Sequence, residues 1–486
     1  MLNVIKQRLK QLFWWGWDSP TATAWAGQGA QVLRVLLLTP LLISRFSLTE
    51  IASWYLFAST TFLGAILCQR SKMTFSRMVS MAVGGARELI PIKPGQQTVQ
   101  VESEAETKEL LRTLCSTFSS LFILIALLSL LVSSATGYFA LQELNNDATN
   151  VSRVCFAFVV FLFGNFFVNA NSKYDSLLQG LGHVSLVNRI NVGGALLSVA
   201  LGSLSLCFGA DIFILACIVQ AVTVVNLLLF RYFASLELKG LGISGVDWRI
   251  DSQCISWAKE PLVKGFVSQL CINGVMQFSA ILIPFYYSAT IVATYLFSLR
   301  IFQMIVSFSM APTFSYQPVF AKLLAAGEIA RFRDVVVRKS RLSLIVFVLA
   351  SVFAGVGISY GIKFLNTELV FMPIKIWLLL TGLALLERFN MICRMICSVG
   401  NHIILVRQYV LIGGVSLSLL MLTGNEHMMV FIVLSLWGPP ALLPGFSALK
   451  YASRLLQVKR EYILTSVLVP ALVFLSVFVA LNIYVL

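Results

Sequence analysis

The stretch IASWYLFASTTF, residues Ile51 to Phe62, returns 240 residues later as IVATYLFSLRIF, residues Ile291 to Phe302. At the same offset, Val79 falls on Val319. This internal repeat indicates that the chain contains two copies of one half. In membrane proteins, duplicated halves usually place a substrate site between them.

A second repeated sequence lies further along each copy. The sequence GHVSLV at Gly182 to Val187 corresponds to NHIILV at Asn401 to Val406. The pair Gly193-Gly194 returns as Gly413-Gly414. Because the two repeated sequences occur in the same order, the duplication extends over most of the chain.

The composition is that of a membrane protein. Hydrophobic residues make up 58% of the 486 residues, charged residues only 12%, and the mean hydropathy is +0.86. Such a chain has too little polar surface to cover a soluble particle of this size. The net charge of +15 would suggest nucleic acid in a soluble protein, but here the basic residues alternate with apolar runs, so we expect no nucleic-acid partner.

Thirteen apolar runs approach the roughly 20 residues needed to cross a bilayer. They lie at 22–43, 48–68, 113–134, 153–171, 186–208, 211–233, 262–284, 288–311, 342–362, 371–391, 403–423, 427–447 and 463–485. The runs predict an all-α polytopic membrane protein of about 12 to 14 transmembrane helices. Two six-helix lobes would form a parallel pseudo-repeat, followed by one extra C-terminal helix.

The predicted domains follow from this pattern. We expect an N-terminal six-helix lobe over residues 1–235, a cytoplasmic linker over 236–261, a C-terminal six-helix lobe over 262–450 and an additional helix over 451–486. If the N-terminus is cytoplasmic, 30 of the 36 Lys and Arg residues lie in inner segments and four in outer ones. The positive-inside rule therefore predicts a cytoplasmic N-terminus.

Several classes of chemistry find no support in the sequence. The nine cysteines form no CxxC pair and have no His at ligand spacing, so neither a disulfide framework nor a metal site is indicated. The chain has no GxxxxGK[ST] phosphate loop, and no other motif calls for a cofactor. No predicted outer loop exceeds about 20 residues, which leaves little room for an outer catalytic domain. We therefore expect a protein that is not an enzyme.

Charged residues within spans are the candidate site residues. Arg34 in the first span and Arg300 in the eighth would each cost about 2.5 to 3.5 kcal/mol near a helix centre, so both are expected to face a wet interior. Guanidinium groups there would suit an anion, and phosphate in particular. Lys264 enters the seventh span and either extends this basic lining or snorkels to the interface.

Two carboxylates complete the candidate set. Glu50 and Glu387 lie near span ends, where each could form an ion pair or carry a coupling proton. Neither lies convincingly at the middle of a span. This weakens the hypothesis of a proton-coupled drug antiporter, because an exporter of organic cations should place a carboxylate in its cavity.

The chain resembles a known family. The two six-span halves, the Tyr-Leu-Phe sequence in the second and eighth spans, the Gly182-His183 sequence before the fifth span and the arginines within spans are similar to one branch of the multidrug/oligosaccharidyl-lipid/polysaccharide (MOP) exporter superfamily. That branch contains the polysaccharide transporters and the bacterial O-antigen flippases. The resemblance covers about residues 20–450. The family usually has twelve or fourteen spans, so a count of thirteen is a departure at the C-terminal end.

The resemblance implies a function in polysaccharide and lipopolysaccharide biosynthesis. Such proteins move an undecaprenyl-diphosphate-linked oligosaccharide from the inner to the outer leaflet of the bacterial inner membrane by alternating access. Carried onto this chain, the diphosphate ligands would be Arg34 and Arg300, with Lys264 in addition. A polysaccharide polymerase and a chain-length regulator would be candidate partners, alongside membrane lipid.

Two alternatives remain open. One is a cation-coupled exporter of small molecules, similar to the MATE transporters of the same superfamily. The other is a membrane glycosyltransferase or ligase acting on the same lipid. The sign of the charge in the cavity separates the first alternative from a flippase, and the short outer loops disfavour the second.

Overall fold

The computed structural model is built of α-helices, which confirms the predicted fold class. It describes residues 19–46, 48–89, 103–144, 151–243, 249–271, 289–365, 371–399, 406–421, 428–443, 445–473 and 475–476. Helices are the expected solution for an apolar chain, because a helix satisfies every backbone hydrogen bond within its own segment when water is absent.

Seven helical stretches among the described residues are long and apolar enough to cross a membrane. They are Glu104–Ala135, Ser152–Gly180, Val184–Cys207, Ile212–Gly240, Ile329–Gly357, Ile374–Val399 and Val430–Leu455. These stretches coincide with seven of the thirteen predicted spans. The protein is thus a multi-pass membrane protein.

The other predicted spans are described in part. Those at 22–43, 48–68, 288–311 and 403–423 fall on helices. Much of the predicted spans at 262–284 and 463–485 lies outside the described residues.

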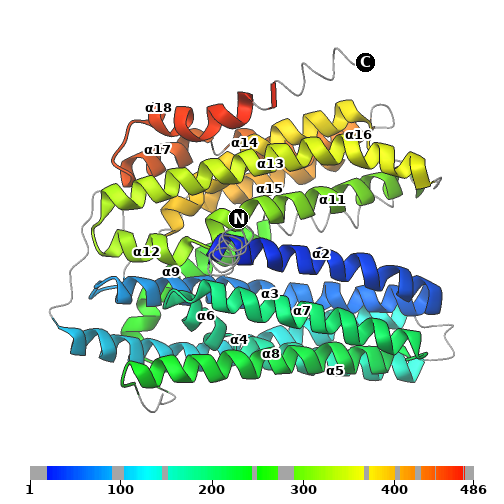
Figure 1. The fold of residues 1–486 in the computed structure, drawn as a ribbon, viewed down its shortest axis with the longest axis horizontal. Coiled ribbons are helices and arrows are strands. Elements are labelled where there is room, and N and C mark those ends of the chain that lie inside the picture. Colours follow the sequence, from blue (N-terminus) through cyan, green and yellow to red (C-terminus); the bar gives the residue numbers. More distant parts are fainter. Residues whose placement is uncertain are drawn as a thin grey trace, which may run out of the picture. The chain divides into compact units, whose positions relative to one another are not determined.

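The chain divides into two compact units, and the described residues of the first end at Leu262. The first unit contains α2 (Pro20–Arg45), α3 (Leu48–Val83), α4 (Glu104–Leu144), α5 (Val151–Ala170), α6 (Lys173–Gly180), α7 (Val184–Cys207), α8 (Ile212–Gly240) and the start of α9 (Ser252–Gln269). The order of neighbours is α2, α7, α8, α5, α4, α3. The six long helices lie alongside one another and form a bundle (Figure 1).

The described residues of the second unit begin at Val263. It contains α11 (Ala289–Phe314), α12 (Gln317–Ala325), α13 (Ile329–Leu365), α14 (Ile374–Val399), α15 (Val406–Met421), α16 (Met428–Leu442), α17 (Gly445–Leu455), α18 (Arg460–Ile463) and the π-helix η2 (Leu464–Leu468). Its neighbour order is α11, α13, α14, α16, α15. The first unit repeats this order as α3, α4, α5, α8, α7. Each unit therefore packs its copy of the repeat in the same way.

Aromatic side chains from the repeated segment form the core of each unit. In the first unit, Phe57 is fully buried, with its ring centroid 5.4 Å from that of Phe158. In the second, Phe302 is fully buried and packs edge-on against Trp377 at 5.7 Å and Trp437 at 5.0 Å. Edge-to-face contacts at these distances are favourable. Packing therefore accounts for one aromatic residue of the repeated segment in each unit, although Phe57 and Phe302 are not equivalent positions of the repeat.

The two copies differ at the end of the repeated segment. In the first, α3 continues without a break to Val83. In the second, the equivalent helix stops at Phe314 and restarts as α12 at Gln317, with Pro318 in the first turn. Proline lacks the N–H group that a continuous helix would use and clashes with the preceding turn. At the same repeat position, the first copy has Met78, which allows α3 to continue.

The predicted linker over 236–261 is largely helical where it is described. Residue Gly240 ends α8, and Ser252 begins α9. The chain between them is held against α4, since the Ser116 hydroxyl accepts a 2.9 Å hydrogen bond from the Arg249 backbone N–H. Residues 244–248 lie outside the described residues.

Candidate functional site

Arg34 lies on the face of α2 that packs against α7. Ala30 on one side of it packs with Val192 and Ala195 of α7. Leu38 on the other side packs with Leu206. Since residues four apart follow one row along a helix, Arg34 continues this row between them.

Three contacts fix the register of the two helices. The Asn188 side chain donates to the Thr23 hydroxyl at 3.2 Å near the start of both helices. The packing of Ala30 and Leu38 follows at later positions, so α2 and α7 run in the same direction. At 1.5 Å per residue, Arg34 lies at the level of Ser198. The hydroxyl of Ser198 is buried and makes no hydrogen bond within the described part of the chain.

The Arg34 guanidinium is partly buried in this apolar setting. No hydrogen bond or ion pair joins it to another residue that the structure describes. A guanidinium remains charged at every physiological pH, and burying a charge without a partner is costly. The position therefore calls for water or an anion beside Arg34.

The other two predicted diphosphate ligands belong to the second unit. Arg300 is in α11, and its side chain lies outside the described residues. Lys264 is a partly buried residue of α9, and its backbone carbonyl accepts a 2.7 Å hydrogen bond from the Ser268 hydroxyl. Because Arg34 belongs to the first unit, the convergence of the three cations on one ligand stays a prediction.

The two candidate carboxylates have different settings. Glu50 is partly buried in the first turn of α3, where the helix dipole favours a negative charge. Glu387 is buried in α14 between two guanidinium groups. Its Oε2 accepts from Arg388 at 2.8 Å and its Oε1 from Arg394 at 3.1 Å. Glu387 therefore already has two ion-pair partners.

This cluster of Glu387, Arg388 and Arg394 carries a net charge of +1. The three side chains are only 6%, 10% and 9% exposed, in that order. The Arg394 guanidinium also lies over the ring of Tyr409 in α15, 5.2 Å from its centroid. The cluster thus places a surplus positive charge inside the second unit and links α14 to α15.

Sequence reasoning did not single out Arg388, which lies within the predicted span at 371–391, or Arg394, and did not pair either with Glu387. One signal for the pairing was present. Residues seven apart lie on the same face of a helix, as Glu387 and Arg394 do. A search for opposite charges at this spacing would have found the cluster.

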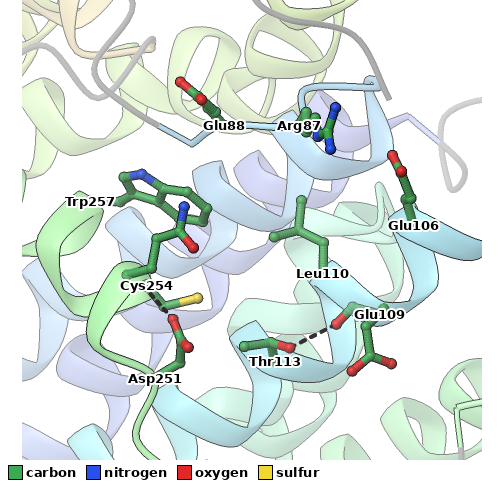
Figure 2. A pocket seen from close by; sticks show the side chains of 10 residues that line it. Arg87, Glu88, Glu106, Glu109, Leu110, Thr113, Asp251, Cys254 and Trp257 are labelled. Atoms are coloured by element: carbon green, nitrogen blue, oxygen red, sulfur yellow. Dashed lines mark hydrogen bonds between the residues drawn. The ribbon is translucent and has the colours of Figure 1, made fainter. Parts of the chain in front are cut away.

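The first unit also contains an acidic cleft of about 570 Å³. Figure 2 shows Glu106 and Glu109 on α4 facing Asp251 and Trp257 across the cleft. The remaining lining residues are Arg87, Glu88, Leu110, Thr113, Gln253 and Cys254. Among the described residues, no three His, Cys, Asp or Glu side chains are arranged to hold a metal ion. The charged side chains of the cleft are mostly negative, whereas Arg34 is positive, so the two positions do not suit the same ligand.

No protein-family model matches the sequence, and no curated protein matches it. Solved structures do match the fold. A mutant MATE transporter superposes with a TM-score of 0.69 at 14% identity, covering 90% of this chain and 98% of its own. An outward-facing multidrug resistance MATE family transporter of the MOP superfamily gives 0.69 at 13% identity, covering 91% and 98%.

A MATE transporter from Vibrio cholerae is also similar. Its TM-score is 0.66 at 14% identity, with 92% of this chain and 97% of the other covered. Identities this low show likeness of fold and do not extend to substrate. The chain has the fold of the MATE transporters, which belong to the MOP superfamily that the sequence resembles.

Proposed function

We propose that this protein is a flippase that moves an undecaprenyl-diphosphate-linked oligosaccharide from the inner to the outer leaflet of a bacterial inner membrane. The observation that supports it most is the setting of Arg34. This fixed cation lies in an apolar helix and has no ionic partner within the described chain. A phosphate group of the substrate would supply the missing negative charge.

Physical chemistry explains why such a substrate needs a protein. Sugar hydroxyls and phosphate charges would lose their hydration in hydrocarbon with nothing in exchange. Under the proposal, Arg34 binds the diphosphate, and Arg300 and Lys264 add positive charge. The lipid tail stays in the bilayer. Alternating access between two duplicated lobes then exposes the site to each side in turn.

The fold alone is equally consistent with a cation-coupled exporter like the MATE transporters. A site for organic cations requires a carboxylate that is not already neutralised. In the described spans, Glu387 is held by two guanidinium groups, and the surplus charge of that cluster is positive. Charge therefore favours an anionic substrate. Glu50 remains the candidate for a coupling or ion-pairing carboxylate.

The test is transport by the purified full-length protein in proteoliposomes. The probe is a fluorescent undecaprenyl-diphosphate oligosaccharide, whose transfer is followed by quenching from outside. We expect Arg34→Ala to lose most transport and Arg34→Lys to retain part of it, because lysine keeps the charge and loses the forked donor. Arg45→Ala, at the exposed end of the same helix, is the matched control.

Two results would contradict the proposal. One is transport of the lipid by Arg34→Ala at the rate of Arg45→Ala. The other is a wild-type protein that transports a cationic dye when a proton gradient is imposed but does not transport the lipid. The second result would favour the MATE-like exporter. Sugar transfer from donor to acceptor by the purified protein would favour a glycosyltransferase or ligase.

A further inference from the structure

The first unit contains a second, smaller cavity with the opposite charge to the acidic cleft. Its volume is about 230 Å³, below the roughly 300–1,000 Å³ of pockets that hold drug-sized ligands. It therefore suits a single small polar group. Its lining comes from α3, α4, α6 and α8, and consists of Phe75, Cys115, Ser119, Lys173, Tyr174, Leu177, Arg231, Ser235 and Leu238.

The charged residues of this lining are both cations. Lys173 donates a 3.0 Å hydrogen bond to the buried Ser119 hydroxyl and lies 5.1 Å from the centroid of the Tyr174 ring. Arg231 reaches the cavity from α8, close enough for its charge to act on Lys173. Two like charges beside one cavity repel each other unless an anion lies with them.

Nearby carboxylates are engaged with other side chains. Asp175, two residues after Lys173, binds Lys72 at 3.1 Å. Glu237, near the end of α8, binds His183 at 3.3 Å. The cavity therefore gathers positive charge although acidic residues lie close to it in the sequence.

The position along α8 identifies the level in the membrane. Leu228, Leu229, Tyr232 and Leu236 are all at least 40% exposed, and they form the apolar flank of this helix around Arg231. The last turn then carries Lys239. A tyrosine and basic residues at the end of an apolar run are typical of the membrane–water interface, where phosphate headgroups lie.

We propose that this cavity binds a phosphate group, held between Lys173 and Arg231, and that the group is the headgroup of an anionic phospholipid. Basic pockets between transmembrane helices bind such headgroups. The Ser119 hydroxyl accepts from Lys173 and holds its ammonium group at the cavity. Phe75, Leu177 and Leu238 form an apolar wall. The site is separate from Arg34 and does not depend on the transported substrate.

The test is thermal unfolding of the purified full-length protein in neutral detergent. The additives are phosphatidylglycerol, phosphatidylcholine or inorganic phosphate. A ligand that binds only the folded state raises the unfolding temperature. We expect phosphatidylglycerol to raise it and phosphatidylcholine to raise it less. In Arg231→Gln, the apparent affinity for phosphatidylglycerol should fall by about tenfold or more, because a charge-assisted hydrogen bond is lost.

Matched variants separate binding from folding. Lys239→Gln removes an exposed cation from the same helix and should leave the response unchanged. Arg231→Lys keeps the charge and should retain part of the response. A shift with inorganic phosphate alone would support the site and assign it to free phosphate. The proposal would be overturned if wild type and the Lys173→Gln/Arg231→Gln double variant respond equally to phosphatidylglycerol. It would also be overturned if wild type responds neither to phosphatidylglycerol nor to inorganic phosphate.

Discussion

Replacing Glu387 by Gln should destabilise the second unit strongly. The substitution keeps the shape of the side chain and removes its charge. Arg388 and Arg394 would then be two buried cations without a carboxylate between them. Their exposed fractions of 10% and 9% classify this as a buried ion pair. Breaking such a pair from one side costs about 3–5 kcal/mol.

This cost corresponds to a change of about 150- to 4,500-fold in the ratio of folded to unfolded protein. The midpoint of thermal unfolding should fall by an amount on the order of 10 °C. The assay is tryptophan fluorescence of the purified protein in detergent during heating. Trp377 lies in the same helix and is buried, so it contributes to the signal together with the other eight tryptophans of the chain.

The matched control is Glu328→Gln. Glu328 binds Arg331 at 3.2 Å, but the two side chains are 47% and 71% exposed. Exposed pairs contribute only about 0–1 kcal/mol, so the midpoint should change little. Adding Arg394→Met to Glu387→Gln removes one surplus charge and should recover part of the loss. If Glu387→Gln unfolds at the same temperature as Glu328→Gln, the cluster does not stabilise the fold.

Three further predictions follow from local packing and chemistry. Gly180→Ala should destabilise the protein by about 1–3 kcal/mol, because a new Cβ would lie 2.7 Å from a side-chain carbon of α3. The control Gly193→Ala has open space for the new Cβ and should be neutral or stabilising. Chemical or thermal unfolding compares the two variants. Burial, together with a neighbouring carboxylate, raises the pKa of the Cys254 thiol to about 12. Maleimide should therefore label Cys254 slowly at pH 7.5 and label the exposed thiol of a Ser256→Cys variant quickly. Equal labelling rates for the two thiols, measured by mass spectrometry, would contradict this. Trp377→Phe should cost about 1–3 kcal/mol in the same unfolding assay, because the indole N–H donates a 2.9 Å hydrogen bond to a buried backbone carbonyl.

The helices could be predicted because hydrocarbon leaves the chain few alternatives. Apolar runs of roughly 20 residues must form helices to satisfy their backbone in lipid. The ends of these helices were harder to predict. The predicted span at 48–68 is the start of a helix that continues to Val83, and Phe75 and Met78 in this extension are fully buried. Hydropathy does not detect these turns, because they pack against protein beyond the apolar run.

The candidate site could be predicted only in part. Arg34 was identified because a single cation within an apolar run is visible in the sequence. The cavity with Lys173 and Arg231 could not be, since its two cations are far apart in the chain and only packing brings their helices together. The acidic cleft of Figure 2 depends in the same way on α9 returning to α4. Charge that gathers by tertiary packing leaves no local pattern.

The difference between the two copies bears most directly on function. Both copies pack their equivalent helices in the same order, so the scaffold is the same in both. Their charges diverge. The cluster around Glu387 lies in α14, while the equivalent helix α5 carries Arg153 as its single charged residue. A charge buried in an apolar helix is costly, so it persists where it contributes to structure or function. The proposed function rests on these unmatched cations, because their sign suits an anionic substrate better than an organic cation.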